Sequence, residues 1–359
     1  MTTLLDQHVG VVCDLDGVVY RGPAPIPHAV ASLERAREQA SVVFATNNAS
    51  RTIADVSNQL RSLGIDDPQV ITSAGAGAAL IVEQLGPEAT VLPVGGEGLV
   101  EALTRVGLVL VRDASQNPAA VLQGWAPHVS QADLAQATIA VSGGAFWVAT
   151  NTDLAVPTPA GLVPGNGPLV AAVAAVTGVD PMVAGKPHPP LFRSAVAQIG
   201  SQRSEVGADT VLGIGDRLDT DVLGATGAGL PALWVLTGVD RFVQLAGHTA
   251  TPTYAAPDLN ALHRPYPAVS RRDTTWASGP ISVTVGAPGD RLTVCGMSEL
   301  PDDQALATLV AIAARIVCGI RDLGDSELAG RLASEFDAIV DGFASADQDD
   351  SASQSSSVS

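Results

Sequence analysis

Two acidic residues follow the first apolar stretch of the chain. VGVVC, residues 9–13, is succeeded by Asp14 and Asp16, which are two residues apart. Two carboxylates at the end of a buried strand repel each other and are costly to remove from water. Such a pair is retained where a cation or a reacting group lies between them. The pair therefore predicts a site that also contains a metal ion or a positive charge.

Three further polar clusters could complete this site. They are Thr46, Asn47 and Asn48 after SVVFA, Lys186 within GKP, and Asp216, Asp219 and Asp221 within GDRLDTD. Asp14 and Asp216 could bind a hard divalent cation, with a main-chain carbonyl and waters completing the octahedron that magnesium prefers. A metal ion, a lysine and a threonine hydroxyl are the groups that neutralise and hold the oxygens of a phosphoryl group. The four clusters together indicate phosphoryl chemistry.

The carboxylates of Asp14 and Asp16 can take different parts in this chemistry. One carboxylate can attack phosphorus and form an aspartyl-phosphate. The other can protonate the departing alkoxide and afterwards activate water. This division requires two neighbouring carboxylates in different protonation states.

Parallel strands that alternate with helices would bring the four clusters together. Apolar runs such as SVVFA and TVLGIG lead into the polar clusters, and helical patterns such as RTIADVSNQLRSLG follow them. This order is typical of an α/β protein with a parallel sheet that is covered on both faces. Sites in such sheets lie at the carboxyl ends of the strands, where all the polar clusters fall.

The sequence predicts a Rossmann-like parallel-sheet core with two additions. The core comprises residues 1–76 and 183–262, and an α/β cap is inserted at residues 77–182. After a linker at 263–272, residues 273–343 form a small α+β appendage, with one hairpin at a Pro-Gly-Asp turn and two helices. The polar tail at 344–359 is expected to be disordered. The apolar helices of the appendage could pack on the core or on a second subunit, so a homodimer is one arrangement that they allow.

Composition limits the classes of molecule that the protein is expected to bind. The 359 residues carry a net charge of −18, which argues against nucleic acid or an anionic membrane as a partner. The apolar stretch from Leu169 is too short to cross a bilayer, and the first ten residues do not resemble a signal peptide. The three cysteines, Cys13, Cys295 and Cys318, have no ligand spacing and are expected to be reduced. These features predict a cytoplasmic protein that does not bind membranes.

The motifs DLDGVVY, TNN, GKP and GDRLDTD resemble, in this order, the four signatures of the haloacid dehalogenase-like phosphatases. The resemblance covers roughly residues 8–260. The large insertion is similar to that of the branch that contains para-nitrophenyl phosphatases and the phosphoglycolate and glycerol 3-phosphate phosphatases. The joint occurrence of four motifs is far more specific than any one of them.

The resemblance implies a role for each residue of the motifs. Asp14 would be the nucleophile and Asp16 the general acid and base. Thr46, the Asn47 backbone and Asn48 would bind the phosphate or substrate, and Lys186 would stabilise its charge. The implied cofactor is Mg²⁺, bound by Asp14, the Asp16 carbonyl and Asp216 with support from Asp221. An acid at position 16 serves an alkoxide leaving group, so the implied reaction is hydrolysis of a phosphate ester.

The substrate is expected to be a small phosphorylated metabolite, because a cap over the strand ends would exclude large molecules. Residues 149–167, at the end of the cap, contain no Lys, Arg or His. This favours glycerol 3-phosphate over phosphoglycolate, whose carboxylate would find no cationic partner there. Phosphoglycolate, another small phosphate ester and, as a different class, a non-catalytic metabolite-sensing scaffold are the alternatives. Asp219 and His188 could contact ligand or metal, or lie in solvated loops.

Overall fold

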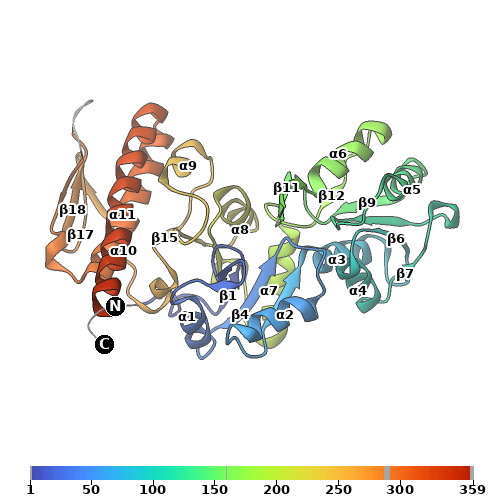
Figure 1. Ribbon diagram of the computed structural model, residues 1–359, viewed down its shortest axis with the longest axis horizontal. Coiled ribbons are helices and arrows are strands. Elements are labelled where there is room, and N and C mark those ends of the chain that lie inside the picture. The colour runs from blue at the N-terminus through green and yellow to red at the C-terminus, as the bar shows by residue number, and fades with distance from the viewer. Residues whose placement is uncertain (1, 159, 287–291, 356–359) are drawn as a thin grey trace.

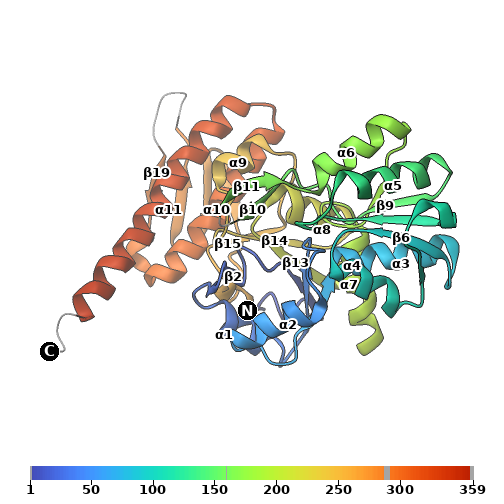
Figure 2. The same cartoon turned by 45° about the vertical axis from the view of Figure 1, so that its right-hand side comes forward.

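The chain folds into three units. The computed structural model describes residues 2–158, 160–286 and 292–355, and the side chains up to residue 343 within those ranges. Figure 1 shows the core between the inserted cap and the C-terminal module. Figure 2 shows from a second direction that the cap and the module lie on opposite sides of the core.

Within the described residues, six parallel strands form the core sheet, in the order β15-β14-β13-β1-β4-β5. The strands are β1 (Gly10–Cys13), β4 (Ser41–Thr46), β5 (Gln69–Thr72), β13 (Val211–Gly215), β14 (Ala232–Val235) and β15 (Tyr254–Ala256). Cys13 is in register with Phe44 and Ile214, so the residues that follow β1, β4 and β13 emerge at one edge of the sheet. This confirms the predicted parallel α/β core.

Helices cover both faces of the core sheet, as its continuous burial requires. They are α1 (Ala29–Ala36), α2 (Ile53–Ser62), α3 (Ser73–Leu85), α7 (Pro190–Gln202), α8 (Leu223–Gly227) and α9 (Phe242–Gly247). A capping box starts α2: the Thr52 hydroxyl accepts the Asp55 N–H at 3.1 Å, and the Asp55 carboxylate accepts the Thr52 N–H at 3.2 Å. A two-stranded β-ribbon, β2 (Tyr20–Arg21) and β3 (Ala24–Pro25), follows the first aspartates.

The inserted cap has a parallel sheet of its own, in the order β12-β9-β8-β6-β7. Its strands are β6 (Thr90–Val94), β7 (Val109–Leu110), β8 (Ala120–Gln123), β9 (Phe146–Ala149) and β12 (Met182–Val183), and its helices are α4 (Glu97–Arg105), α5 (Gln131–Ser142) and α6 (Asn166–Thr177). A hairpin, β10 (Ala155–Thr158) and β11 (Gly161–Pro164), connects β9 to α6. Helix α3 is continuous across the predicted core–cap boundary at 76/77, and β12 spans the boundary at 182/183.

The C-terminal module has an antiparallel sheet packed on two long helices. The strands β16 (Ser270–Arg272), β17 (Thr275–Ser278), β18 (Ile281–Thr284) and β19 (Thr293–Cys295) pair in sequence order, and the helices are α10 (Asp302–Asp322) and α11 (Ser326–Ser355). The sequence predicts only the β18–β19 hairpin and treats residues 270–272, which form β16, as linker. The Pro-Gly-Asp turn of that hairpin lies outside the described residues.

The C-terminal helices differ from the sequence-based expectations in one feature. The backbone of α11 is helical to Ser355, so most of the tail that we expect to be disordered is helical here, and residues 356–359 lie outside the described part. Helix α10 is long and apolar enough to cross a membrane, but 67% of its apolar window is buried inside the protein. Its hydrophobicity therefore serves the packing of the module.

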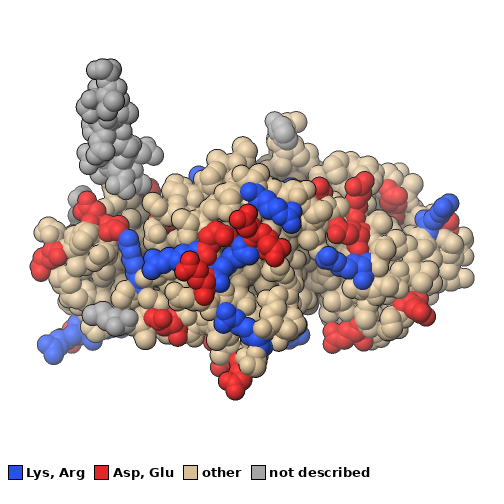
Figure 3. Space-filling view, turned by 90° about the horizontal axis from the view of Figure 1, so that it is seen from below, with Lys and Arg blue, Asp and Glu red and all other residues tan. Residues whose placement is uncertain are grey.

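Surface charge is mixed on the face seen from below. Figure 3 shows Lys and Arg side chains on this face interrupted by Asp and Glu side chains. Ion pairs also connect the module with the rest of the chain, because Arg264 lies against Asp303 and Arg241 of the core lies 3.8 Å from Asp341. The absence of a nucleic-acid partner stays a prediction from net charge.

Burial of Phe336 predicts that the C-terminal module is a stabilising part of the fold. The side chain is 0% exposed, and its ring lies 5.8 Å from that of Phe242 in the core. We expect Phe336→Ala to lower the free energy of unfolding by about 3 kcal/mol, because it leaves a cavity between two units. Urea denaturation followed by tryptophan fluorescence measures this loss. Leu323→Ala is the control: Leu323 is 76% exposed, so a loss of similar size there would contradict the argument.

Candidate active site

Asp14, Asp221 and Lys186 form a buried ion cluster at the carboxyl edge of the core sheet. Asp14 directly follows β1, and its carboxylate Oδ1 pairs with the Lys186 ammonium. The same ammonium lies 2.7 Å from Oδ1 of Asp221. The second oxygen of Asp221 accepts the Arg217 N–H at 3.1 Å. Both oxygens of Asp221 are therefore occupied.

Asp216 is held from several sides and keeps one oxygen free. Its Oδ2 accepts the Val239 N–H at 2.8 Å, and its carbonyl oxygen accepts the indole N–H of Trp234 at 3.0 Å. Its buried Oδ1 has no hydrogen-bond partner among the described residues. A Cβ at Gly17 or Gly238 would lie 2.4 Å or 1.8 Å from Asp216 Oδ2, so both positions require glycine. A buried carboxylate oxygen that is held in one orientation and has no hydrogen-bond partner is available to bind a cation.

Burial controls the protonation of these carboxylates. It raises the pKa of Asp14 well above its ordinary value; the Lys186 ammonium opposes this shift, and the neighbouring carboxylates of Asp221 and Asp216 add to it. Burial likewise raises the pKa of Asp216 to about 7, with Asp221 acting in the same direction. Burial alone would lower the pKa of Lys186, but the charges of Asp14 and Asp221 raise it above its ordinary value. Lys186 is therefore a permanent cation.

The donor set fits a hard divalent metal ion. Asp14, Asp216 and Asp221 each offer a carboxylate oxygen, and these three atoms lie within 4.8 Å of one another. Oxygen ligands of this kind suit Mg²⁺, whose charge would also offset the repulsion among them. Since Asp221 is engaged by Lys186 and the Arg217 N–H, Asp14 and Asp216 are the residues that would hold the ion.

Asp16 lies beside this cluster and keeps an exposed surface. The protein around its carboxyl group displaces part of the water, which raises its pKa, while Lys186 and Arg51 oppose the shift. A carboxyl group with a raised pKa that remains accessible is suited to donate and accept a proton. Asp16 thus differs from Asp14, whose oxygen is paired with the ammonium.

The threonine and asparagines after β4 contribute in different ways. Thr46 is buried, and its hydroxyl oxygen accepts the Asn48 N–H at 3.1 Å, which shapes the turn at the strand end. The side chain of Asn48 is occupied by the same loop, because its Oδ1 accepts both the N–H and the hydroxyl of Ser50. A phosphate-binding role for Thr46 and Asn48 stays a prediction from the sequence.

Asn47 fastens Lys186 in place with its side chain. Its Oδ1 accepts the Lys186 N–H at 2.8 Å, and its Nδ2 donates to the Lys186 carbonyl at 3.0 Å. The Asn47 carbonyl oxygen in turn accepts from the Ser73 hydroxyl at 2.8 Å and from Nδ2 of Asn151 at 2.9 Å. The sequence predicts only a backbone role for Asn47, and the side-chain contacts add a second one.

Two residues of the cap, Asn151 and Asp153, lie next to Asn47, and the sequence analysis does not identify them as site residues. Asn151 binds Asn47 as described, and Asp153 lies 3.5 Å from the Asn47 amide. Burial raises the pKa of Asp153, although Arg217 and Lys186 act in the opposite direction. A signal for Asn151 exists in the sequence: Ala-Thr-Asn occupies residues 45–47 at the end of β4 and recurs at residues 149–151 at the end of β9.

The remaining candidates lie at the periphery. Asp219 forms a two-point ion pair with Arg217, at 3.1 Å and 2.7 Å, and both side chains are about half exposed. His188 follows Lys186 on an exposed stretch. Neither Asp219 nor His188 belongs to the group of carboxylates that could share a metal ion within the described residues.

Comparison with known families matches both halves of the core. The model described as haloacid dehalogenase-like hydrolase matches residues 11–109, and the model described as HAD-hydrolase-like matches residues 183–262. These two ranges include Asp14, Lys186 and Asp216.

Among curated proteins, D-glycerol 3-phosphate phosphatase of Mycobacterium tuberculosis is 40% identical over 325 residues, which is 88% of each chain. Acid sugar phosphatase of Staphylococcus aureus is 35% identical over 259 residues, covering 71% of this chain and 97% of that protein. The first match extends beyond the core and cap, which end near residue 262 of the 359 residues.

Solved structures agree with these similarities. The crystal structure of glycerol phosphate phosphatase from Mycobacterium tuberculosis in complex with magnesium has a TM-score of 0.73 and 36% identity, covering 94% of this chain and 93% of that one. The p-nitrophenyl phosphatase from Archaeoglobus fulgidus has a TM-score of 0.66 and 28% identity, covering 71% and 98%. The chain therefore belongs to the haloacid dehalogenase-like hydrolases and, within them, to the phosphoric monoester hydrolases that carry an inserted cap.

Proposed function

We propose that this protein is a Mg²⁺-dependent phosphatase that hydrolyses a small phosphate monoester, with glycerol 3-phosphate as the best candidate, through an aspartyl-phosphate on Asp14. The observation that carries the proposal is the convergence of Asp14, Asp216 and Asp221 on one point beside Lys186. A metabolite-sensing scaffold would have no need to keep so many like charges together against their repulsion. Magnesium, when bound by Asp14 and Asp216, would supply positive charge to the phosphoryl oxygens.

In the first step, a carboxylate oxygen of Asp14 attacks phosphorus, and the bond from phosphorus to the ester oxygen breaks. Lys186, held by Asn47 from behind, stabilises negative charge on the phosphoryl oxygens and keeps Asp14 oriented. Asp16 donates its proton to the departing alkoxide, so the product leaves as an alcohol. The protein then carries an acyl phosphate on Asp14.

In the second step, Asp16, now ionised, accepts a proton from a water molecule that attacks the phosphorus. The bond between phosphorus and the Asp14 oxygen breaks, which regenerates the carboxylate and releases inorganic phosphate. Asp16 ends the cycle protonated, as it began. Its raised pKa suits both directions of this proton transfer.

The charge of the cap segment favours a substrate in which the group attached to the phosphate is a neutral polyol. The segment at residues 149–167 offers no cationic side chain, and it places the Asp153 carboxylate beside Asn47. A second carboxylate on the substrate would be repelled there, whereas hydroxyl groups could donate hydrogen bonds to Asp153. The name of the curated relative that matches 88% of this chain supports the same choice.

Pre-steady-state kinetics with p-nitrophenyl phosphate test the covalent step. Its leaving group is weakly basic and needs no proton, so Asp16→Asn should release about one p-nitrophenol per enzyme in a burst and then turn over at least about 100-fold more slowly than the wild type. Asp14→Asn should fold normally yet give no burst and no turnover. EDTA should abolish turnover by the wild type, and added Mg²⁺ should restore it.

The matched control for these variants is Asp219→Asn, which makes the same chemical change at an exposed carboxylate paired with Arg217. It should turn over near the wild-type rate. A burst from Asp14→Asn, or wild-type turnover in the presence of EDTA, would contradict the proposal.

Substrate preference is tested by comparing kcat/KM for glycerol 3-phosphate and phosphoglycolate. We expect glycerol 3-phosphate to be favoured, and Asp153→Asn to narrow the difference by improving phosphoglycolate, because one repelling charge is removed. Asp180→Asn, at an exposed position beyond the far end of α6, is the control and should leave the ratio unchanged. A preference for phosphoglycolate of more than tenfold would overturn the assignment of the substrate.

A further inference from the structure

The C-terminal module caps the first turn of α9, a short helix of the core. Asp337 projects from α11, and its Oδ1 accepts the Phe242 N–H at 2.9 Å. Its Oδ2 accepts the Val243 N–H at 3.1 Å. The first N–H groups of a helix have no partner within the helix, so a carboxylate that binds two of them fixes where and in which direction the helix begins. Here the carboxylate comes from a different unit, 94 and 95 residues further along the chain.

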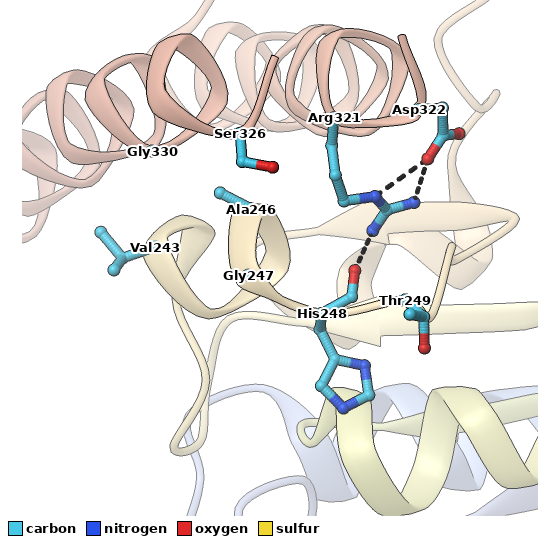
Figure 4. A pocket seen from close by; sticks show the side chains of 9 residues that line it. All are labelled: Val243, Ala246, Gly247, His248, Thr249, Arg321, Asp322, Ser326 and Gly330. Atoms are coloured by element: carbon cyan, nitrogen blue, oxygen red, sulfur yellow. Dashed lines mark hydrogen bonds and ion pairs between the residues drawn. The ribbon is translucent and has the colours of Figure 1, made fainter. Parts of the chain in front are cut away.

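The same module also holds the other end of α9. Arg321 of α10 donates from Nη1 to the carbonyl oxygens of Leu245, at 3.2 Å, and Ala250, at 3.0 Å, and also to that of His248. Figure 4 shows the guanidinium of Arg321 crossing the pocket between α9 and the junction of α10 with α11. Carbonyls at the end of a helix lack partners within the helix, and a guanidinium is well suited to bind several of them.

Aromatic packing at the start of α9 connects the core sheet with α11. The Phe242 ring lies edge-on to Trp234 of the core, at 5.4 Å, and 5.8 Å from Phe336 of α11. All three rings are buried. Trp234 is the residue whose indole N–H binds the Asp216 carbonyl oxygen. The packing therefore connects α11 with the backbone of a candidate metal ligand through the rings of Phe242 and Trp234.

The residues that lead into α9 hold the Asp216 side chain. The Val239 N–H binds Asp216 Oδ2 at 2.8 Å, and Gly238 lies directly against the same carboxylate. Asp240 accepts the Leu218 N–H at 2.6 Å, which secures the loop that follows Asp216. Only Arg241 separates this segment from Phe242, which Asp337 binds. The position of α9 therefore sets the position of the donors that aim Asp216.

From these contacts we propose that Asp337 is a positioning residue for the magnesium site: by clamping α9, the C-terminal module keeps residues 238–240 in the arrangement that aims the free oxygen of Asp216. The inference rests on the proposed function, because it concerns the affinity of that site for Mg²⁺. Among the described residues, the carboxylates that could share the metal ion all belong to the core, so the module acts through main-chain donors. The Val239 N–H, which binds the Asp216 carboxylate directly, is a contact of the kind whose loss changes metal affinity by about 10- to 100-fold. Asp337 acts on this donor through the chain segment 239–242.

The test is calorimetric titration of Mg²⁺ into the full-length protein without substrate, together with the melting temperature of the metal-free protein. Asp337→Ala should raise the Kd for Mg²⁺ by about tenfold, while kcat at saturating Mg²⁺ stays close to that of the wild type. Asp337→Asn retains one acceptor oxygen for one of the two N–H groups, so its Kd should lie between those of the wild type and Asp337→Ala. It also serves as the measured variant should Asp337→Ala fail to fold.

Asp341→Ala is the matched control. Asp341 lies one turn further along α11, faces Arg241 at 3.8 Å with a side chain that is 65% exposed, and its replacement removes the same charge. Its Kd for Mg²⁺ should equal that of the wild type. If the Asp337 variants melt at a lower temperature but bind Mg²⁺ as the control does, their role is structural and the inference is overturned. If the wild type itself binds no Mg²⁺ and releases no phosphate, the proposed function fails first, and this outcome is distinct.

Discussion

One buried ammonium group makes the rest of the site possible. Asp14, Asp216 and Asp221 are gathered at the edge of a parallel sheet, where burial raises the pKa of Asp14 and Asp216. Lys186 is the buried cation that contacts two of the three carboxylates. Removing one partner of such a buried cluster leaves an uncompensated charge, which is far more destabilising than losing a surface pair. The fold must therefore hold Lys186 as firmly as it holds the carboxylates.

The three units of the chain meet this requirement together. The core places the acidic residues at neighbouring strand ends. The cap binds Asn47, whose side chain holds the main chain of Lys186. The C-terminal module binds α9, which follows the donors to Asp216. The core and the cap contribute hydrogen bonds to residues of the site, and the module contributes hydrogen bonds to the helix that follows the donors to Asp216. Preorganisation therefore comes from more of the chain than the residues with carboxylates.

Local sequence patterns predict the core and much of the site because both depend on local signals. Apolar runs followed by polar residues identify β1, β4 and β13, and parallel register then brings Asp14, Thr46 and Asp216 to one edge. The side-chain role of Asn47 escapes such reasoning, because its partners lie 139 residues away at Lys186 and 106 residues away at Asp153. The strand β16 escapes as well, since its pairing with β17 rather than its own exposed sequence makes it a strand. The pattern of neighbouring residues in the sequence does not predict which distant segments pair with each other.

The β10–β11 hairpin of the cap exposes apolar side chains to solvent, in contrast to the buried ion cluster. Leu154 and Leu162, at the start of the connection and within β11, are 78% and 77% exposed, and β10 and β11 pair mainly with each other. Substitutions at such positions change the free energy of unfolding little. Selection can therefore rewrite this hairpin rapidly while the buried chemistry stays fixed, and homologous enzymes can diverge in the metabolites they accept without inventing a new fold.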